Sequence, residues 1–491
     1  MRPQWSLLVV AFVNVLTCEK PSAAAEEPAA PLGRVQKGAV DAVDRLSSEI
    51  LAVNRSIWEF AEVGLEEHRS SALLVDKLKS AGFRVRTGLA DIPTAFVAEF
   101  GEGRPIIGLL CEYDALPGLS QKLSPDRDPV KDGAPGHGCG HSGLGAGTLG
   151  AVLAVKSAME QHRLPGTIRL YGTPAEETLI GKVYMTLAGD FRDLDVCLHY
   201  HPSTRNESWS GSSKAAVSAK FTFHGTAAHA AGSPEKGRSA LDAVELMNVG
   251  TNYMREHIKG DARIHYVITE GGGAPNVVPA KATVWYYVRA DDHRGVEEYF
   301  GWISDIAKGA ALMTRTKFDV QVDTDCHEII PNTALSELVL KNLKAVGPPK
   351  FTEADRAFAR RLQEPLIAEF RTKFSDAIDE KVYSLVEAAR PAGGSTDVGD
   401  VSWHIPTGGL RTACMAAESP GHSWQNVAAI ASPIGEKGIL YASKVLAVTM
   451  IDLLQSPAEV TAAKAEFDKR MKDRPYTTLI PKGQKAPKKI R

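Results

Sequence analysis

The sequence predicts an α/β protein of 491 residues in which a smaller α+β domain is inserted into a larger domain. Helical and extended patterns alternate over residues 39–213, as in a mixed or parallel sheet that is flanked by helices. Over residues 214–325 the order changes to strand, helix, strand, strand, helix, strand, which is the split-βαβ arrangement of a ferredoxin-like open sandwich. Residues 326–468 are expected to complete the first domain.

Apolar periodicity predicts the individual elements. In the first domain, apolar residues recur at three- and four-residue steps over residues 39–63 and predict a helix. The other elements expected there are helices over 71–81 and 143–161, strands over 95–100, 105–110 and 167–171, and helical structure over 352–389. The inserted domain is expected to hold strands over 217–223, 263–268, 282–289 and 318–323, and helices over 239–257 and 296–314.

The first 25 residues are typical of a secretory signal peptide. Arg2 supplies a positive charge, an apolar run follows over residues 6–17, and small residues occupy positions 23–25. The run is too short to span a membrane as a mature helix. An unstructured N-terminal tail is the alternative, and Cys18 leaves a lipid anchor open. We therefore expect an exported protein, either periplasmic or secreted.

The composition excludes several classes of protein. Hydrophobic residues make up 44% and charged residues 24% of the chain, as in soluble globular proteins, and no membrane span is expected after the signal peptide. Lys and Arg number 57 against 59 Asp and Glu, so no basic excess is present for binding nucleic acid. Six cysteines are too few for a disulfide scaffold. The basic tail over residues 469–491 is expected to be solvated and disordered.

A glycine-rich segment over residues 136–143 brings a thiol and an imidazole together. The glycines allow tight backbone turns, so Cys139 and His141 can point at one centre while a helix begins behind them. A thiolate and an imidazole suit a borderline-soft divalent ion such as zinc. The alternative is a glycine-rich turn with a buried cysteine.

Acids and histidines follow other predicted strands. Glu176 and Glu177 are adjacent at a strand end, where one can bind metal while the other faces a substrate; a solvated acidic loop is the alternative. An apolar strand ends in His199 and His201, and a core position is preferred for His199. Two more groups complete the set, Asp114 after the strand at 105–110 and His422 in a late turn.

Taken in this order, these clusters resemble the zinc-dependent amidohydrolases and exopeptidases of the M20 peptidase family, and within it the aminobenzoyl-glutamate hydrolase B-subunit group. The likeness runs from about residue 39 to residue 454 and includes the segments 112–118 and 394–402. The resemblance implies a zinc-exopeptidase-like catalytic domain with an inserted dimerisation and lid domain. The mature protein would then be a homodimer, and a need for an unlike subunit is left open.

By the same resemblance, Glu176 is the general base and Asp114 is the acid that orients a metal ligand. His201 is preferred to His199 as a ligand, because the family's ligand lies six positions after the acid that is Asp195 here. Two divalent ions per chain, zinc or manganese, are implied. Their implied ligands are Cys139, His141, Glu177, His201 and His422.

Two positions depart from the family's pattern. Glu112 stands where other branches have a histidine, which implies the cysteine-containing version of the metal site, and Ser142 stands where many relatives have an acid. In the inserted domain, His229 matches a histidine that supports the oxyanion in the partner subunit's site. Asn276 and Arg289 are candidates for holding the substrate carboxylate. Without the resemblance, these three would be interpreted as a strand-end histidine, a turn asparagine and a surface arginine.

The expected function is therefore a metal-dependent hydrolase of an amide bond next to a free carboxylate. Its substrate would be a small carboxylate-bearing molecule, either an N-acyl or an aryl-amide amino acid, and an aryl amide of glutamate is the nearest family substrate. A dipeptidase of the same fold is one alternative. A non-catalytic metal- or carboxylate-binding relative is another, which the Glu176–Glu177 pair disfavours because binding alone needs no proton shuttle.

Overall fold

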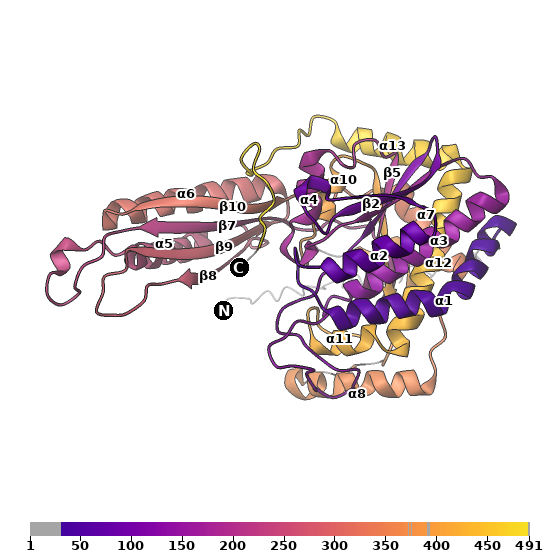
Figure 1. Cartoon of the computed structure of the whole chain (residues 1–491), viewed down its shortest axis with the longest axis horizontal. Helices are drawn as coiled ribbons and strands as arrows, with labels where there is room; N and C mark the ends of the chain where they lie inside the picture. Colours follow the sequence, from indigo (N-terminus) through magenta and orange to yellow (C-terminus); the bar gives the residue numbers. More distant parts are fainter. Residues whose placement is uncertain (1–30, 372, 375, 390–392, 490–491) are drawn as a thin grey trace, which may run out of the picture.

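The computed structural model describes residues 31–371, 373–374, 376–389 and 393–489. Figure 1 shows a larger α/β domain from which an elongated smaller domain projects. The smaller domain is formed by one internal stretch of the chain, so the predicted inserted arrangement is correct. The predicted signal peptide lies outside the described residues, and export stays a prediction.

An eight-stranded mixed sheet forms the centre of the larger domain. Its strands are β1 (Arg84–Thr87), β2 (Phe96–Glu102), β3 (Ile106–Cys111), β4 (Gly166–Gly172), β5 (Val196–Ser203), β6 (Asn206–Ser208), β11 (Val382–Tyr383) and β12 (Thr407–Ala413). They follow the order β1-β2-β4-β3-β5-β12-β6-β11. Because β4, β3, β5 and β12 are parallel neighbours, their carboxyl ends meet at one edge of the sheet.

Helices cover both faces of this sheet. One face packs against α1 (Arg34–Phe60), α2 (His68–Ser80), α3 (His141–His162), α7 (Thr333–Val346) and α12 (Pro433–Gln455). The other face packs against α4 (Gly181–Ala188) and α10 (Val398–Ser402). Side chains of β3 alternate between the two layers, since Ile107 and Leu109 join the first and Leu110 joins the second.

The expectation that no segment after the signal peptide reaches membrane-spanning length is wrong for α12. This helix has 23 residues and is apolar enough to cross a membrane by length and composition alone. It packs against α1, α3 and α7, and 78% of its most apolar window is buried inside the protein. Burial in the core therefore accounts for its apolar sequence.

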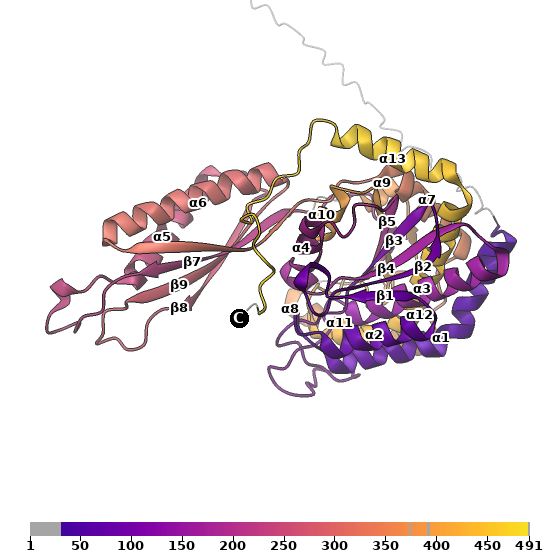
Figure 2. The same cartoon turned by 45° about the horizontal axis from the view of Figure 1, so that its top comes forward.

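The inserted domain is an open sandwich of four strands and two helices. Its elements in chain order are β7 (Ala215–His224), α5 (Ala240–Met254), β8 (Arg263–Glu270), β9 (Lys281–Ala290), α6 (His293–Thr314) and β10 (Lys317–Cys326). The strand order β10-β7-β9-β8 is the ferredoxin-like order that the sequence predicts. Helices α5 and α6 cover one face, and β8 is an edge strand whose side chains are mostly exposed (Figure 2).

The helical structure predicted over residues 352–389 is only partly present. Thr352 caps α8 (Glu353–Phe370), which ends at Arg371 in a left-handed conformation. Beyond it the chain supplies β11, which pairs in parallel with β6, and the four-residue α9 (Leu385–Ala388). Pairing with the sheet edge thus overrides the local helical pattern.

The prediction that residues 469–491 are solvated and disordered is wrong for the part that the structure describes. After α13 (Pro457–Met471) the chain runs back to the junction of the two domains (Figures 1 and 2). There the Tyr476 hydroxyl donates to Asp400 Oδ1 at 2.7 Å, and Ile480 is buried in an apolar cluster to which both domains contribute. The basic composition of the tail does not predict these contacts, because uncharged groups such as the Tyr476 hydroxyl and the Ile480 side chain make them.

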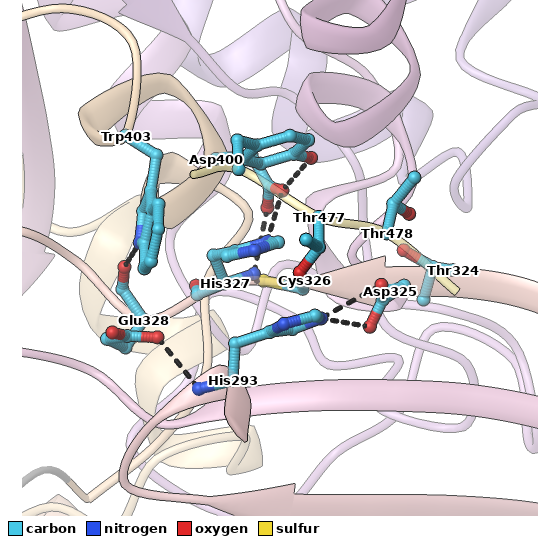
Figure 3. A network of polar contacts seen from close by, with 12 residues as sticks. His293, Thr324, Asp325, Cys326, His327, Glu328, Asp400, Trp403, Thr477 and Thr478 are labelled. Carbon is cyan, nitrogen blue, oxygen red and sulfur yellow. Dashed lines mark hydrogen bonds and ion pairs between the residues drawn. The ribbon is translucent and has the colours of Figure 1, made fainter. Parts of the chain in front are cut away.

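A polar network joins the two domains at this junction (Figure 3). His293, at the start of α6, places Nε2 2.9 Å from both carboxylate oxygens of Asp325, and His327 Nδ1 is 3.2 Å from Asp400 Oδ1. The two imidazole rings stack with centroids 3.8 Å apart. The Leu479 amide also donates to Asp325, so the C-terminal segment ties the base of the inserted domain to the larger domain.

Candidate functional site

The five candidate ligands come together at the carboxyl edge of the central sheet. Cys139 and His141 lie at the N-terminus of α3, where Gly140 has φ +85° and precedes the helix. A Cβ atom at Gly140 would lie 2.9 Å from Pro202 Cβ, so both the backbone conformation and the close approach require glycine. His201 comes from the end of β5, which lies directly against this turn.

The ligand atoms form two groups of three that share one thiol. Cys139, His141 and His201 form the first group, and Cys139, Glu177 and His422 form the second; within each group all candidate ligand atoms lie within 4.8 Å of one another. Cys139 Sγ is 3.3 Å from His201 Nε2, and His422 Nε2 is 3.4 Å from Glu177 Oε2. The shared thiol makes the arrangement suited to two neighbouring ions.

Two hydrogen-bond acceptors determine which ring nitrogen of His141 and of His201 faces the ligand cluster. Asp114 Oδ1 is 2.8 Å from His141 Nδ1, and Asp114 Oδ2 accepts from the Glu177 amide at 2.9 Å. The Pro202 carbonyl oxygen is 2.6 Å from His201 Nδ1. Both histidines therefore direct Nε2 toward the thiol and the acids, as ligating histidines do.

The unpaired atoms of this cluster fit a divalent cation. His141 Nε2 and Glu177 Oε1 are buried and have no hydrogen-bond partner among the described residues. Burial and the neighbouring Asp114 raise the pKa of Glu177 to about 8, and burial raises the pKa of the Cys139 thiol. Burial and the charge of His141 lower the pKa of His201 to about 3, so its ring is neutral. Sulfur, nitrogen and oxygen donors in this setting suit a divalent metal ion, whose binding would release protons from the site.

Glu176 lies beside the ligand cluster on the short 3₁₀ turn Glu176–Thr178 after β4. Its Oε2 is 3.8 Å from His141 Nε2, and burial together with Glu112 raises the pKa of Glu176 well above its ordinary value. The side chain lines a cavity of about 410 Å³ that also holds Cys139, Glu177, His201 and His422. A water or substrate in this cavity would therefore contact both the ligand cluster and Glu176.

The inserted domain contributes one of its three candidate residues to this cavity. Arg289, on β9, lines it. His229 and Asn276 do not line it in the same chain. Both are exposed, and they lie together in the inserted domain, where His229 pairs with Val277 and the Ala230 amide donates to the Asn276 carbonyl at 3.0 Å.

A buried ion cluster beneath the site was not predicted from the sequence. Lys182 is fully buried, with Nζ 2.8 Å from Glu112 Oε1 and 2.5 Å from Asp397 Oδ1. His199 is 1% exposed and places Nε2 3.3 Å from Glu112 Oε1, so it lies below the candidate ligands rather than among them. Burial favours the neutral amine, but Asp397 and Glu112 outweigh it and raise the pKa of Lys182. The only signal was a lysine in an otherwise apolar segment.

Glu67 is a second buried acid that sequence reasoning missed. It precedes α2 and is fully buried, and its Oε1 accepts from the Ala175 amide at 2.8 Å, one residue before Glu176. Its Oε2 accepts from Thr94 Oγ1 at 3.1 Å. Burial and Asp114 raise the pKa of Glu67 to about 8. Glu67 thus anchors the turn that carries both functional acids.

Comparison with known proteins gives one family and several full-length relatives. The profile described as Peptidase family M20/M25/M40 matches residues 108–426, which include every candidate ligand. The chain is 38% identical over 464 residues to the B subunit of p-aminobenzoyl-glutamate hydrolase from Escherichia coli (strain K12), covering 90% of this chain and 96% of that protein. It is 28% identical over 470 residues to the Xaa-Arg dipeptidase of Mus musculus, with coverages of 93% and 97%.

Solved structures share the fold. A dinuclear metal-binding peptidase of the M20 family from Bacillus subtilis superposes with a TM-score of 0.54 and 15% identity. The superposition covers 84% of this chain and 99% of that structure. The two chains therefore share a fold over most of their lengths.

Replacing His201 and His199 separately should distinguish a ligand from a buried neighbour. We expect His201→Ala to lower the metal content of the purified protein, because Nε2 faces the shared thiol, whereas His199→Ala should retain metal. Elemental analysis after dialysis measures the content, and thermal unfolding checks that both variants fold. Equal metal contents in the two folded variants would contradict the assignment of His201.

Glu67 should make stability depend on pH. Its pKa is about 8 in the folded protein against 4.5 in the unfolded chain, so the folded state holds the extra proton between these values. Its contribution is complete below about pH 4.5 and is lost as the pH rises toward 8, by at most ~1.4 kcal/mol per pH unit.

Glu67→Gln should therefore reduce the decline in unfolding free energy over this window, as measured by urea denaturation at several pH values. The side-chain amide of this variant can still accept from the Ala175 amide, although the Thr94 hydroxyl must reorient to accept. Glu66→Gln, at the exposed neighbouring position, is the control and should leave the decline unchanged. Parallel pH profiles for wild type and Glu67→Gln would show that Glu67 does not carry the effect.

Proposed function

The chain belongs to peptidase family M20, and from that premise we propose that it is a metal-dependent hydrolase of an amide bond beside a free carboxylate. One observation carries the proposal: two groups of candidate metal ligands share Cys139 and lie at a cavity that Glu176 and Arg289 also line. Ligands and an acid support hydrolysis, and the arginine supports a carboxylate on the substrate. Aryl amides of glutamate are the first substrates to test, given the name of the Escherichia coli relative.

Cys139, His141, Glu177, His201 and His422 would hold two zinc or manganese ions. Such ions, when bound, polarise the scissile carbonyl and acidify a water. Asp114 fixes the relative positions of two ligands, because its carboxylate hydrogen-bonds to both the His141 ring and the Glu177 backbone amide. Lys182 balances the buried charge of Glu112 directly below.

Glu176 would move the proton. Its carboxylate takes a proton from the attacking water and delivers it to the leaving nitrogen, so that the amine departs neutral. Arg289 would hold the carboxylate next to the scissile bond, since its planar guanidinium matches that group. Burial of Glu176 keeps bulk water from competing for the proton.

A dipeptidase is the second candidate, supported by the 28% identity to the Xaa-Arg dipeptidase. The charge of the cavity distinguishes a dipeptidase of this specificity from a hydrolase of glutamate amides. Arg289 and Arg411 both line it, and a substrate with a C-terminal arginine would place a third cation beside them. The cavity therefore favours acidic over basic amino acids on the leaving side.

Glu176→Gln should retain metal and lose activity. The amide keeps the size and polarity of the acid but takes no proton, so kcat should fall by ~10²–10⁴ on aminobenzoyl-glutamate. The assay uses metal-loaded protein and a panel of N-acyl amino acids, aryl amides and dipeptides. Glu66→Gln serves as a control with a normal rate, and near-normal turnover by Glu176→Gln would remove Glu176 from the mechanism.

We further propose that the active unit is a homodimer in which His229 serves the partner's site. The exposed position of His229, away from the cavity of its own chain, supports this arrangement. So do the exposed apolar side chains of the neighbouring edge strand β8 and helix α5, which a second copy would cover: Leu246, Val249, Tyr253, Val267 and Ile268. The Escherichia coli relative is named as one of the subunits of its hydrolase, which supports a test of whether this chain needs an unlike partner.

Mixing two inactive variants should restore activity if His229 acts across the dimer. His229→Ala and Glu176→Ala should each be nearly inactive alone, but a mixed dimer contains one site with both residues intact. With random exchange at equal amounts, half of the dimers are mixed and each has one good site, so activity should reach about a quarter of wild type. Verified exchange of subunits without recovery would place His229 in a same-chain or structural role.

A further inference from the structure

Two arginines from different domains reach the catalytic cavity from different directions. Arg289 belongs to β9 of the inserted domain, and Arg411 belongs to β12 of the central sheet. Arg411 lies opposite His201 in the parallel register of β12 and β5, so the two side chains emerge on the same face of the sheet. Both arginines line the cavity, but the function proposed above assigns a substrate group to Arg289 alone, namely the carboxylate next to the scissile bond.

Arg411 is held in a fixed orientation. Its Nη1 donates to Glu207 Oε1 at 2.9 Å, and Glu207 is buried on β6, the other neighbour of β12. Its guanidinium carbon lies 4.4 Å from the centre of the Trp209 ring, which also lines the cavity. A guanidinium that is stacked and anchored on one side loses little entropy when it binds a ligand on the other.

The anchored guanidinium still faces the cavity. About 32% of the Arg411 side chain is exposed, and this arginine carries five N–H donors in one plane. The two acids that line the cavity already have roles: Glu177 belongs to the ligand cluster, and Glu176 lies beside that cluster as the proposed proton carrier. A second negative group in the cavity would therefore find its cation in Arg411.

We propose that Arg411 binds a second carboxylate of the substrate, distal to the one next to the scissile amide. This inference rests on the proposed function, in which Arg289 holds the first carboxylate. The preferred substrates would then be amides that carry two negative charges, and Arg411 would be the residue that selects them over amides with one negative charge. A site built to pair a charged group rejects the analogue that lacks it, because its own polar groups are then left without a partner.

The second carboxylate has two possible sources, which two substrate pairs separate. N-benzoyl-glutamate and N-benzoyl-glutamine differ only in the charge at the end of the amino acid side chain. N-succinyl-alanine and its terminal amide, N-succinamoyl-alanine, differ in the charge at the end of the acyl group. The pair whose ratio of kcat/KM depends on Arg411 identifies the end that this residue binds.

The experiment compares metal-loaded wild type with Arg411→Gln, Arg411→Lys and the control Arg205→Gln. Arg205 follows β5, the strand next to β12, but its guanidinium faces Asp379 and Glu418 and does not line the cavity. In one of the two pairs, Arg411→Gln should lower the preference for the dianionic member by roughly tenfold to a hundredfold, mainly through KM. Arg411→Lys should recover part of the preference, and Arg205→Gln should leave it unchanged.

Calorimetric binding of the same four compounds to the Glu176→Gln protein, with and without Arg411→Gln, measures recognition without turnover. The inference holds if Arg411→Gln weakens the dianionic member of one pair selectively. It is overturned if all four compounds weaken equally, as a structural role predicts, or if no ratio changes. Selective binding by a wild-type protein that hydrolyses none of the compounds would refute the proposed hydrolase and leave the role of Arg411 standing.

Discussion

Charge buried at one edge of the central sheet is the constraint on which the rest of the structure depends. Four carboxylates gather there within a largely apolar protein: Glu112, Asp114, Glu176 and Glu177. Burying like charges together is unfavourable unless cations accompany them. Lys182 supplies part of that balance from the chain itself, and the shared ligand groups around Cys139 fit metal ions for the remainder.

The balance depends on segments that are far apart in the chain. Lys182 from α4 reaches Asp397 before α10, and Asp114 after β3 holds the turn after β4. Glu67, before α2, holds the same turn through the Ala175 amide. These contacts place the functional acids on rigid supports, so a water or substrate between them meets groups that need little rearrangement.

Both domains contribute side chains to the cavity. The groups that would carry the chemistry lie on strand ends and the start of α3, whereas Arg289 comes from the inserted domain. The cavity is complete only when that domain is held at its base, where the His293–Asp325 and His327–Asp400 pairs and the C-terminal segment join the two domains (Figure 3). A change in the junction would therefore alter the cavity without touching the metal ligands.

The sequence by itself determined the alternation of helices and strands and the inserted domain, because apolar periodicity is a local property. The five candidate ligands came from the resemblance of short glycine- and histidine-containing segments to a known family. Only the tertiary structure decided the contacts of Lys182, the position of Arg411 beside His201, and the end of the helical region at Arg371. It also decided that the C-terminal segment packs at the domain junction. Each of these features depends on which strands become neighbours and on contacts between residues that are distant in sequence. Such contacts leave no periodic pattern in the sequence of the segments that make them.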